Sequence, residues 1–275
     1  MMEGRVGSTL LMQLLGTSPD VAFDRTYPFE NSYLTYLVKL MGTTVSPAPD
    51  GWTMEQLLYG DGRMAGFPFD PESIDRTTFA TRGLAALWQA FTHCVQEQEG
   101  GPRLLYAEKY WGDVTPVLTA GLAPVVIDVV RDPRDTVASI RAFNAKRGHQ
   151  GFGRAQSTDD ASHLRRLVMG MNLRLSEFEL PLPVPHLLVR YEDLSTDLPG
   201  QAARLSALLG TDLSPDLVTS NRTAMEHHTT SPSVAASIGR WAADLQPEEA
   251  AFIERRMRAH MERLAYLTEP QPPTP

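Results

Sequence analysis

A short segment near the start of the sequence has the residue types of a phosphate-binding loop. Gly4-Arg5-Val6-Gly7-Ser8-Thr9-Leu10 combines two glycines, one cation and two hydroxyls, and an apolar helical run follows it directly. Glycine lets the backbone approach an anion closely, and successive backbone N–H groups in such a turn point inward. The N-terminus of the following helix adds a partial positive charge. The segment therefore predicts a loop, Arg5 to Leu10, that surrounds a phosphate.

This loop differs from the Walker A motif of nucleoside-triphosphate-binding proteins. That motif has a lysine directly before its Ser or Thr, whereas here Gly7 precedes Ser8 and the cation, Arg5, lies two residues earlier. Phosphate-binding loops normally follow a buried strand, and only three residues precede Gly4. We therefore expect a truncated first strand, with the true start about 5–10 residues upstream, the length of an ordinary strand and its lead-in.

A second group of polar residues follows the most apolar strand candidate, residues 124–130. Arg131 ends that run, Pro133 is suited to begin a helix, and Ser139 lies eight positions after Arg131. An arginine at the carboxyl edge of a parallel sheet and a serine about two turns into the next helix can hold one phosphate between them. The alternative is a solvent-exposed cluster of ion pairs, which are common and weak. It would comprise Arg131, Asp132, Arg134 and Asp135.

Two further polar stretches follow later in the chain. In Val-Arg-Tyr-Glu-Asp-Leu, residues 189–194, a strand gives way to a turn, so Tyr191 leaves the sheet at the same edge and can meet a purine. A late loop, residues 228–241, contains hydroxyls, a glycine and an arginine, which suit a flap over an anion. Its candidate ligands are Ser237, Gly239 and Arg240, and we expect Trp241 to anchor it in the core.

Short apolar strands alternate with helices along the chain, which predicts an α/β fold with a mostly parallel sheet flanked by helices. The predicted strands are 103–107, 124–130, 186–190 and, more weakly, 21–23; the predicted helices are 8–16, 82–98, 133–146, 160–178, 199–209 and 247–264. Residues 43–81, rich in Pro, Gly and aromatic residues, interrupt this alternation as a lid or insertion. We expect one domain over residues 1–268 and a disordered proline-rich tail over 269–275.

Composition narrows the class of protein. The 275 residues are 42% hydrophobic, which predicts a packed core, and the net charge of −8 argues against general nucleic-acid binding. There is one cysteine, so an internal disulfide is excluded; its helical spacing from Leu87 and Phe91 places Cys94 in the core. We find no transmembrane segment and no signal peptide, which predicts a soluble cytoplasmic protein. The sequence does not indicate an oligomeric state.

At these four groups of residues the chain resembles the PAPS-dependent sulfotransferases, most closely their bacterial branch, over about residues 4 to 265. The resemblance implies a P-loop-like nucleotide-binding fold and PAPS (3′-phosphoadenosine 5′-phosphosulfate) as cofactor, with adenosine 3′,5′-bisphosphate as product. It implies that Arg5 to Leu10 hold the 5′-phosphosulfate, Arg131 and Ser139 bind the 3′-phosphate, and Tyr191 lies beside adenine. Ser237, Gly239 and Arg240 match the further cofactor contacts of the family's C-terminal flap.

Sulfonyl transfer to a hydroxyl or amine needs a base for the acceptor's proton and cations for the developing charge. Arg5 and Lys109 are the expected cations. The alternative for Lys109 is a surface pair with Glu108 or Asp113, but its place at a strand end, where this edge of the sheet faces the cleft, favours the functional role. No His/Cys/Asp/Glu cluster has the spacing of metal ligands, so we expect no metal.

Family members supply the base as a histidine or as a glutamate after the second strand. In this sequence Glu30 is our choice, with Asp24 second and Glu108 third; a base would need an elevated pKa in a partly apolar pocket. The alternative for Glu30 is that it caps the helix after Pro28 or pairs with Arg25.

The acceptor is not identified by the sequence. Aromatic residues and methionines in residues 43–81 suit an apolar or amphipathic acceptor, a small molecule, lipid or glycan, and suit a structural cover over the core equally well. Two other functions stay open: a nucleotide-dependent small-molecule kinase, disfavoured by the absent Walker lysine, and a non-catalytic nucleotide-binding protein.

Overall fold

A computed structural model of the chain describes residues 4–45, 75–101, 105–110, 112–148, 159–218, 230–231 and 233–267. The chain folds as two compact units. Unit 1 comprises Met1–Ser18 and Val125–Pro275, and unit 2 comprises Pro19–Pro124. The expectation of one domain over residues 1–268 stays a prediction.

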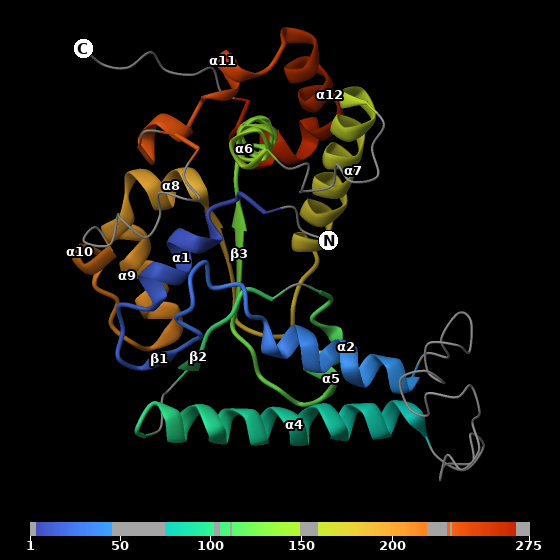
Figure 1. Ribbon diagram of the computed structural model, residues 1–275, viewed down its shortest axis with the longest axis vertical. Helices are drawn as coiled ribbons and strands as arrows, with labels where there is room; N and C mark the ends of the chain where they lie inside the picture. The colour runs from blue at the N-terminus through green and yellow to red at the C-terminus, as the bar shows by residue number, and fades with distance from the viewer. Residues whose placement is uncertain are drawn as a thin grey trace. The chain divides into compact units, whose positions relative to one another are not determined.

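Two parallel strands lie at the centre of unit 1 (Figure 1). β3 (Val126–Val130) pairs with β4 (His186–Arg190) over their full lengths, with Val126 opposite His186 and Val130 opposite Arg190. Parallel neighbours need a crossover connection, which here contains α6 (Pro133–Arg147) and α7 (Asp160–Phe178). Because both strands run in the same direction, the residues that follow them, Arg131 and Tyr191, leave the sheet at one edge.

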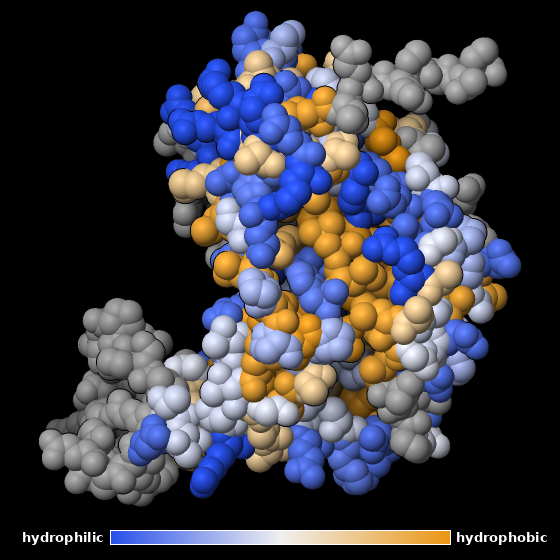
Figure 2. Space-filling view, turned by 180° about the vertical axis from the view of Figure 1, so that it is seen from behind, coloured by the Kyte–Doolittle hydropathy of each residue, from blue (hydrophilic) through white to orange (hydrophobic). Residues whose placement is uncertain are grey.

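The apolar core of unit 1 lies between β3, α6, α7 and α12 (Pro247–Arg263). Ile140, Leu167 and Ile253, one from each of these helices, have no exposed surface. α7 and α12 lie side by side (Figure 1), and the exposed residues of α12 include Arg255 and Arg256. Figure 2 shows hydrophilic residues gathered at the upper left of the view, over these two helices.

Four further helices of unit 1 lie on the other side of β3 (Figure 1). They are α1 (Ser8–Leu15), α8 (Tyr191–Thr196), α9 (Leu198–Leu209) and α10 (Pro215–Val218). The ends of α9 are set by local chemistry: the side chain of Asp197 accepts a hydrogen bond from Gly200 N, and Gly210 ends the helix with a left-handed φ of 69°. A short 3₁₀ turn, η2 (Ala235–Ser237), and α11 (Trp241–Asp244) precede α12.

Unit 2 has a second parallel pair, β1 (Val21–Ala22) and β2 (Leu105–Tyr106). α2 (Tyr33–Val45) packs along α4 (Arg76–Gln98), and α5 (Thr115–Thr119) completes the unit. Met41, Ala80 and Leu84 form the centre of this packing. The observed α/β fold with short parallel strands agrees with the prediction, although the described strands pair in two separate two-stranded sheets.

Several boundaries differ from those predicted. α4 begins at Arg76, six residues early, because the Asp75 side chain caps it by accepting from Thr77 N and Thr78 N. Residues 43–45 and 76–81 of the expected lid are therefore helical, and 46–74 lie outside the described residues. The expected turn after Arg190 is the helix α8. The tail over 269–275 also lies outside the described residues.

The prediction that Cys94 is a core residue is wrong, because this cysteine is exposed. The inward stripe of α4 passes through Ala80, Leu84 and Phe91, and Leu87 beside it is 38% exposed. The half-buried Trp241, in contrast, does pack against the unit 1 core, as predicted. Among the described residues, no helix has the length and apolar character needed to span a membrane.

The two helix glycines Gly210 and Gly42 predict opposite effects of the same substitution. A Cβ at either position would meet nothing within 4 Å, but Gly210 has φ +69° whereas Gly42 lies inside α2. We expect Gly210→Ala to lower the unfolding free energy by about 1 kcal/mol through backbone strain. Gly42→Ala should raise it by about 0.5–1 kcal/mol through helix propensity. Urea unfolding of both variants checks this, and equal effects would contradict the assigned backbone conformations.

Candidate functional site

The loop before α1 has two residues with a left-handed backbone, separated by Val6. Arg5 has φ 81° and Gly7 has φ 100°, both in the left-handed region, and for arginine this conformation is uncommon. α1 begins at Ser8 without a side-chain cap, so Ser8 and Thr9 supply the first N–H groups of the helix. Leu10 N donates to Gly7 O at 3.0 Å, and the Val6 side chain is buried. Left-handed residues of this kind can turn backbone N–H groups toward one side, and the use of this loop as an anion cradle stays a prediction.

Tyr191 packs directly against this loop. A Cβ on Gly7 would lie 2.3 Å from Cδ2 of the Tyr191 ring, so only glycine fits there. The ring lies under the Arg131 guanidinium, whose Cζ is 4.6 Å from the ring centroid, and the hydroxyl lies 2.7 Å from Ser237 Oγ. Tyr191 is 9% exposed, so the protein itself covers most of its surface.

Arg131 connects the loop to the late segment around Ser237. Its Nη1 donates to Arg5 O at 3.1 Å and its Nη2 donates to Ser237 O at 2.5 Å. Its Nε is buried and has no hydrogen-bond partner in the described structure. The alternative of a solvent-exposed ion-pair cluster over residues 131–135 is wrong, because Arg131, Asp132, Arg134 and Asp135 are each at most 7% exposed.

Two guanidinium groups converge in unit 1 on three hydroxyls, which belong to Ser139, Thr230 and Ser231. Arg5 Nε donates to Ser139 Oγ at 3.2 Å, and its Cζ lies 4.6 Å from the Phe143 ring centroid. Arg240 Nη1 donates to Thr230 Oγ1 at 3.1 Å and to Ser231 Oγ at 2.8 Å. Arg5 Nη2 reaches the same Thr230 hydroxyl at 3.5 Å. We call Arg5, Ser139, Thr230, Ser231 and Arg240 the anion cluster, since such donors suit a phosphate.

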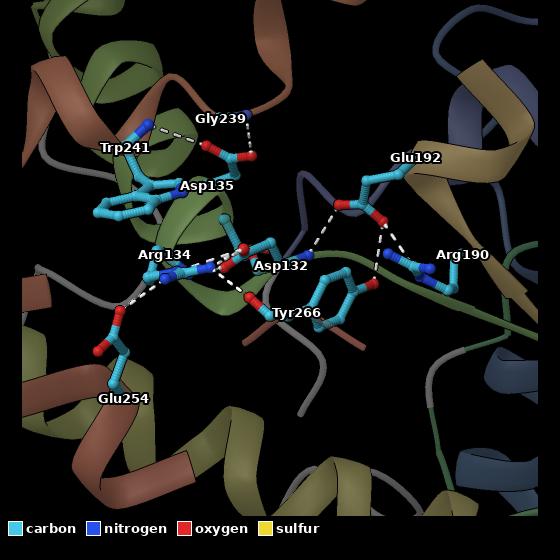
Figure 3. A network of polar contacts seen from close by, with 10 residues as sticks. Asp132, Arg134, Asp135, Arg190, Glu192, Gly239, Trp241, Glu254 and Tyr266 are labelled. Atoms are coloured by element: carbon cyan, nitrogen blue, oxygen red, sulfur yellow. Dashed lines mark hydrogen bonds and ion pairs between the residues drawn. The ribbon is translucent and has the colours of Figure 1, made fainter. Parts of the chain in front are cut away.

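A network of buried polar side chains lies next to these residues in unit 1 (Figure 3). Glu192, in the first turn of α8 just after β4, accepts from Asp132 N and from the Tyr266 hydroxyl, both at 2.9 Å. Burial raises the pKa of Glu192 above its ordinary value. Arg134 donates to Asp132 Oδ2 at 2.7 Å, to Glu254 Oε1 at 2.5 Å and to Tyr266 O at 2.7 Å. The network joins the carboxyl ends of β3 and β4 to the C-terminal helix.

In unit 2, Lys109 is buried with its ammonium group inside a backbone loop. Nζ donates to Pro28 O at 2.7 Å and lies 3.9 Å from Glu30 Oε1, and the Ser32 hydroxyl donates to Lys109 O. The alternative of a surface pair with Glu108 or Asp113 is wrong, because the Lys109 side chain is 6% exposed. Glu30 is 55% exposed and follows Phe29, which has a left-handed φ of 64°.

The two other carboxylates considered as a base have structural partners. Asp24 accepts hydrogen bonds from Thr26 N, Asn31 Nδ2 and the Tyr33 hydroxyl. Burial alone would raise its pKa, but these hydrogen bonds hold the pKa of Asp24 below its ordinary value. Glu108 caps α2 by accepting from Leu34 N at 2.9 Å and Thr35 N at 3.3 Å. Burial nevertheless raises the pKa of Glu108 to about 7.

Comparison with known proteins decides the family. Residues 3–215, more than half of the chain, match the model of the sulfotransferase family. The chain belongs to this family.

One solved structure agrees with that assignment at the level of fold, and a second with a lower score is also similar to the chain. The sulfotransferase domain of the curacin biosynthetic pathway has a TM-score of 0.52 and 16% identity, covering 93% of this chain and 95% of its own. The sulfotransferase domain of the Synechococcus PCC 7002 olefin synthase has a TM-score of 0.48 and 16% identity, covering 97% and 93%. Among curated proteins, no sequence matches.

In this sulfotransferase, unit 1 brings together most of the sequence-predicted site residues. Arg5, Ser139 and Arg240 meet in the anion cluster, while Tyr191 and Ser237 are hydrogen-bonded to each other. Gly239 N donates to Asp135 Oδ2. Sequence reasoning singled out neither Thr230 nor Asp135 as a site residue. Thr230 lay within the hydroxyl-rich late loop, but no local signal pairs it with Ser139, 91 residues earlier.

The raised pKa of Glu108 predicts a pH-dependent stability. The folded state binds the proton more tightly than the unfolded chain, so this stabilisation is present below pH 4.5 and is lost as the pH rises through about 7. The side chain of the Glu108→Gln variant stays neutral at every pH, so this variant does not lose stability in the same way. The difference in unfolding free energy, variant minus wild type, should therefore rise between pH 4.5 and 8 by up to about 3 kcal/mol. Urea unfolding across this range measures the difference, and a constant difference would contradict the burial assigned to Glu108.

Proposed function

We propose that this sulfotransferase moves a sulfonyl group from PAPS to a hydroxyl or amine of a small-molecule, lipid or glycan acceptor. The observation that carries the proposal is the anion cluster beside the loop of residues 4–7, in which two arginines and three hydroxyls converge. PAPS supplies the sulfonyl group that is transferred and leaves as adenosine 3′,5′-bisphosphate.

The residues of unit 1 fit an adenosine bisphosphate. The buried Arg131 Nε has no partner in the described structure, and a phosphate oxygen would satisfy it. We assign the 3′-phosphate to Arg131 and Ser139, with Thr230 and Arg240 as further donors. The backbone from Val6 to Leu10 and the N-terminus of α1 would hold the 5′-phosphosulfate. Tyr191 remains the proposed adenine contact, and Ser237 and Gly239 the proposed flap contacts.

Arg5 contributes fixed positive charge and not a proton. Its guanidinium stays charged at every relevant pH, so it stabilises the charge that develops on the departing phosphate electrostatically. In the described structure its guanidinium donates to Ser139 Oγ and lies over the Phe143 ring, so it also lies beside the proposed 3′-phosphate ligands. With side-chain cations in this role, the proposed transfer proceeds in line and needs no metal.

Glu30 is the proposed base, and Lys109 the proposed second cation. Asp24 is engaged by three donors, and Glu108 is turned into the N-terminus of α2. Glu30, in contrast, is half-exposed, and the structure gives it an ion pair with the buried Lys109 at 3.9 Å. We propose Glu30 as the group that accepts the acceptor's proton because its carboxylate is not taken up by helix capping or by several donors, although its half-exposed position is not the partly apolar pocket expected for a base.

Nucleotide binding tests the assignment of the 3′-phosphate. By calorimetry we expect tight binding of adenosine 3′,5′-bisphosphate without magnesium, and much weaker binding of AMP, which lacks the 3′-phosphate, and of ATP. Ser139→Ala should weaken bisphosphate binding about 10–100-fold through the loss of one charged hydrogen bond, and leave AMP binding unchanged.

Ser195→Ala is the matched control, because the Ser195 hydroxyl is buried without a hydrogen-bond partner in the described structure. It should bind the bisphosphate like wild type. Magnesium-dependent ATP binding would support the kinase instead, and tight bisphosphate binding without sulfonyl transfer to any acceptor would support a non-catalytic nucleotide-binding protein.

Loss of the base should separate turnover from binding. Glu30→Gln keeps the size of the side chain but accepts no proton, so we expect kcat to fall about 10²–10⁴-fold. The bisphosphate dissociation constant should stay within about 2-fold of wild type, since a 2-fold change is well below one hydrogen bond. Sulfonyl transfer from PAPS to a panel of hydroxyl and amine acceptors measures kcat, and wild-type turnover would remove Glu30 as the base.

A further inference from the structure

Asp135 attaches the segment that carries Arg240 to helix α6. One carboxylate oxygen accepts from Gly239 N at 2.7 Å, and the other accepts from Trp241 N at 2.9 Å (Figure 3). The two donors flank Arg240, so a single side chain holds the backbone on both sides of this arginine. Asp135 is 1% exposed, and these bonds are therefore shielded from competing water.

The same helix carries Ser139, four residues after Asp135. Residues four apart lie on one face of a helix, so Asp135 fixes the backbone around Arg240 against the face that presents the Ser139 hydroxyl. The Arg240 guanidinium, held in this way, donates to the Thr230 and Ser231 hydroxyls of the anion cluster. Its own ion pair with Asp244, the last residue of α11, is local and does not attach it to α6.

The side chain of Trp241 is held separately. The Arg134 guanidinium lies 4.0 Å from its ring centroid, and the ring packs against the unit 1 core. Trp241 is thereby anchored even without Asp135, whereas the backbone of Gly239 is attached through its hydrogen bond to the carboxylate. Two interactions therefore hold residues 239–241: the packing of the Trp241 ring, and the hydrogen bonds from the backbone to the Asp135 carboxylate.

We propose that Asp135 is a positioning residue for cofactor binding: it orders residues 239–241 so that Arg240 faces the phosphate that Ser139 contacts. The proposal rests on the proposed function, in which that phosphate belongs to the nucleotide. Ordering a flexible segment before binding removes an entropic cost that the ligand would otherwise have to offset. Asp135 therefore acts through Arg240 and touches no reacting atom.

Amide hydrogen exchange tests the attachment without any ligand. In Asp135→Asn the side chain keeps its shape, but one of its two oxygens becomes an NH₂ group that faces a backbone donor. We expect the Gly239 and Trp241 amides to exchange at least about 10-fold faster, as for the loss of a charged hydrogen bond. Asp128→Asn is the matched control: Asp128 is also buried, but its partner is His186 Nε2, on β4, at 2.7 Å. Equal exchange at both amides in all three proteins would overturn the proposal.

Bisphosphate titration of the same proteins tests the consequence. Asp135→Asn should weaken binding about 10-fold, and Arg240→Ala about 10–100-fold, as for charged hydrogen bonds. In the double variant, the Asp135 substitution should add less than about 2-fold, because its effect passes through Arg240. Additive losses would mean a general structural role and would overturn the proposal. If wild type and Asp128→Asn bind no bisphosphate, the proposed function fails, and the exchange measurement alone then decides whether Asp135 orders the segment.

Discussion

The buried charges at the carboxyl ends of β3 and β4 are the constraint on which the arrangement of unit 1 depends. An unpaired charge in the interior costs several kcal/mol, so each must find partners within the protein. Arg134 is satisfied by two carboxylates and one carbonyl, and Glu192 by a backbone amide and a tyrosine hydroxyl. Satisfying them brings Tyr266 and α12, far along the chain, to the end of the sheet.

This pairing divides the segment that follows β3 into two sets of side chains. Asp132 and Arg134 bind each other and the C-terminal region, whereas Arg131 contacts the carbonyls of Arg5 and Ser237, and Asp135 binds the amides of residues 239 and 241. One short stretch of alternating charge therefore performs two tasks. Two of its members stabilise the fold, and the other two hold the loop and the late segment that contribute the proposed phosphate ligands.

Both units contain a non-glycine residue with a left-handed backbone beside a proposed catalytic group. Arg5 is such a residue itself, and Phe29 immediately precedes Glu30. Strained backbone persists only where the surroundings fix it. At Arg5 the carbonyl accepts from Arg131 and the guanidinium donates to Ser139; next to Phe29, the Pro28 carbonyl accepts from Lys109. Arginine and lysine thus hold the loops through backbone carbonyls as well as supplying charge.

Local sequence chemistry was enough to predict the strands and most ends of the six expected helices, and the spacing of the polar groups was enough for the resemblance to the family. It did not predict five further helices in the described part of the chain, which are α2, α5, α8, α10 and α11. The predicted elements follow from short-range patterns: apolar runs give β3 and β4, Asp197 and Gly210 bound α9, and Gly7 permits the left-handed turn before α1. Long-range packing decided which residues from distant parts of the chain meet and which helix faces are covered. The approach of Tyr191 to Gly7, the meeting of Thr230 with Arg5, and the exposure of Cys94 each depend on which faces of distant elements are buried against one another. Helical spacing shows that residues share a face, but only tertiary packing decides whether that face is covered.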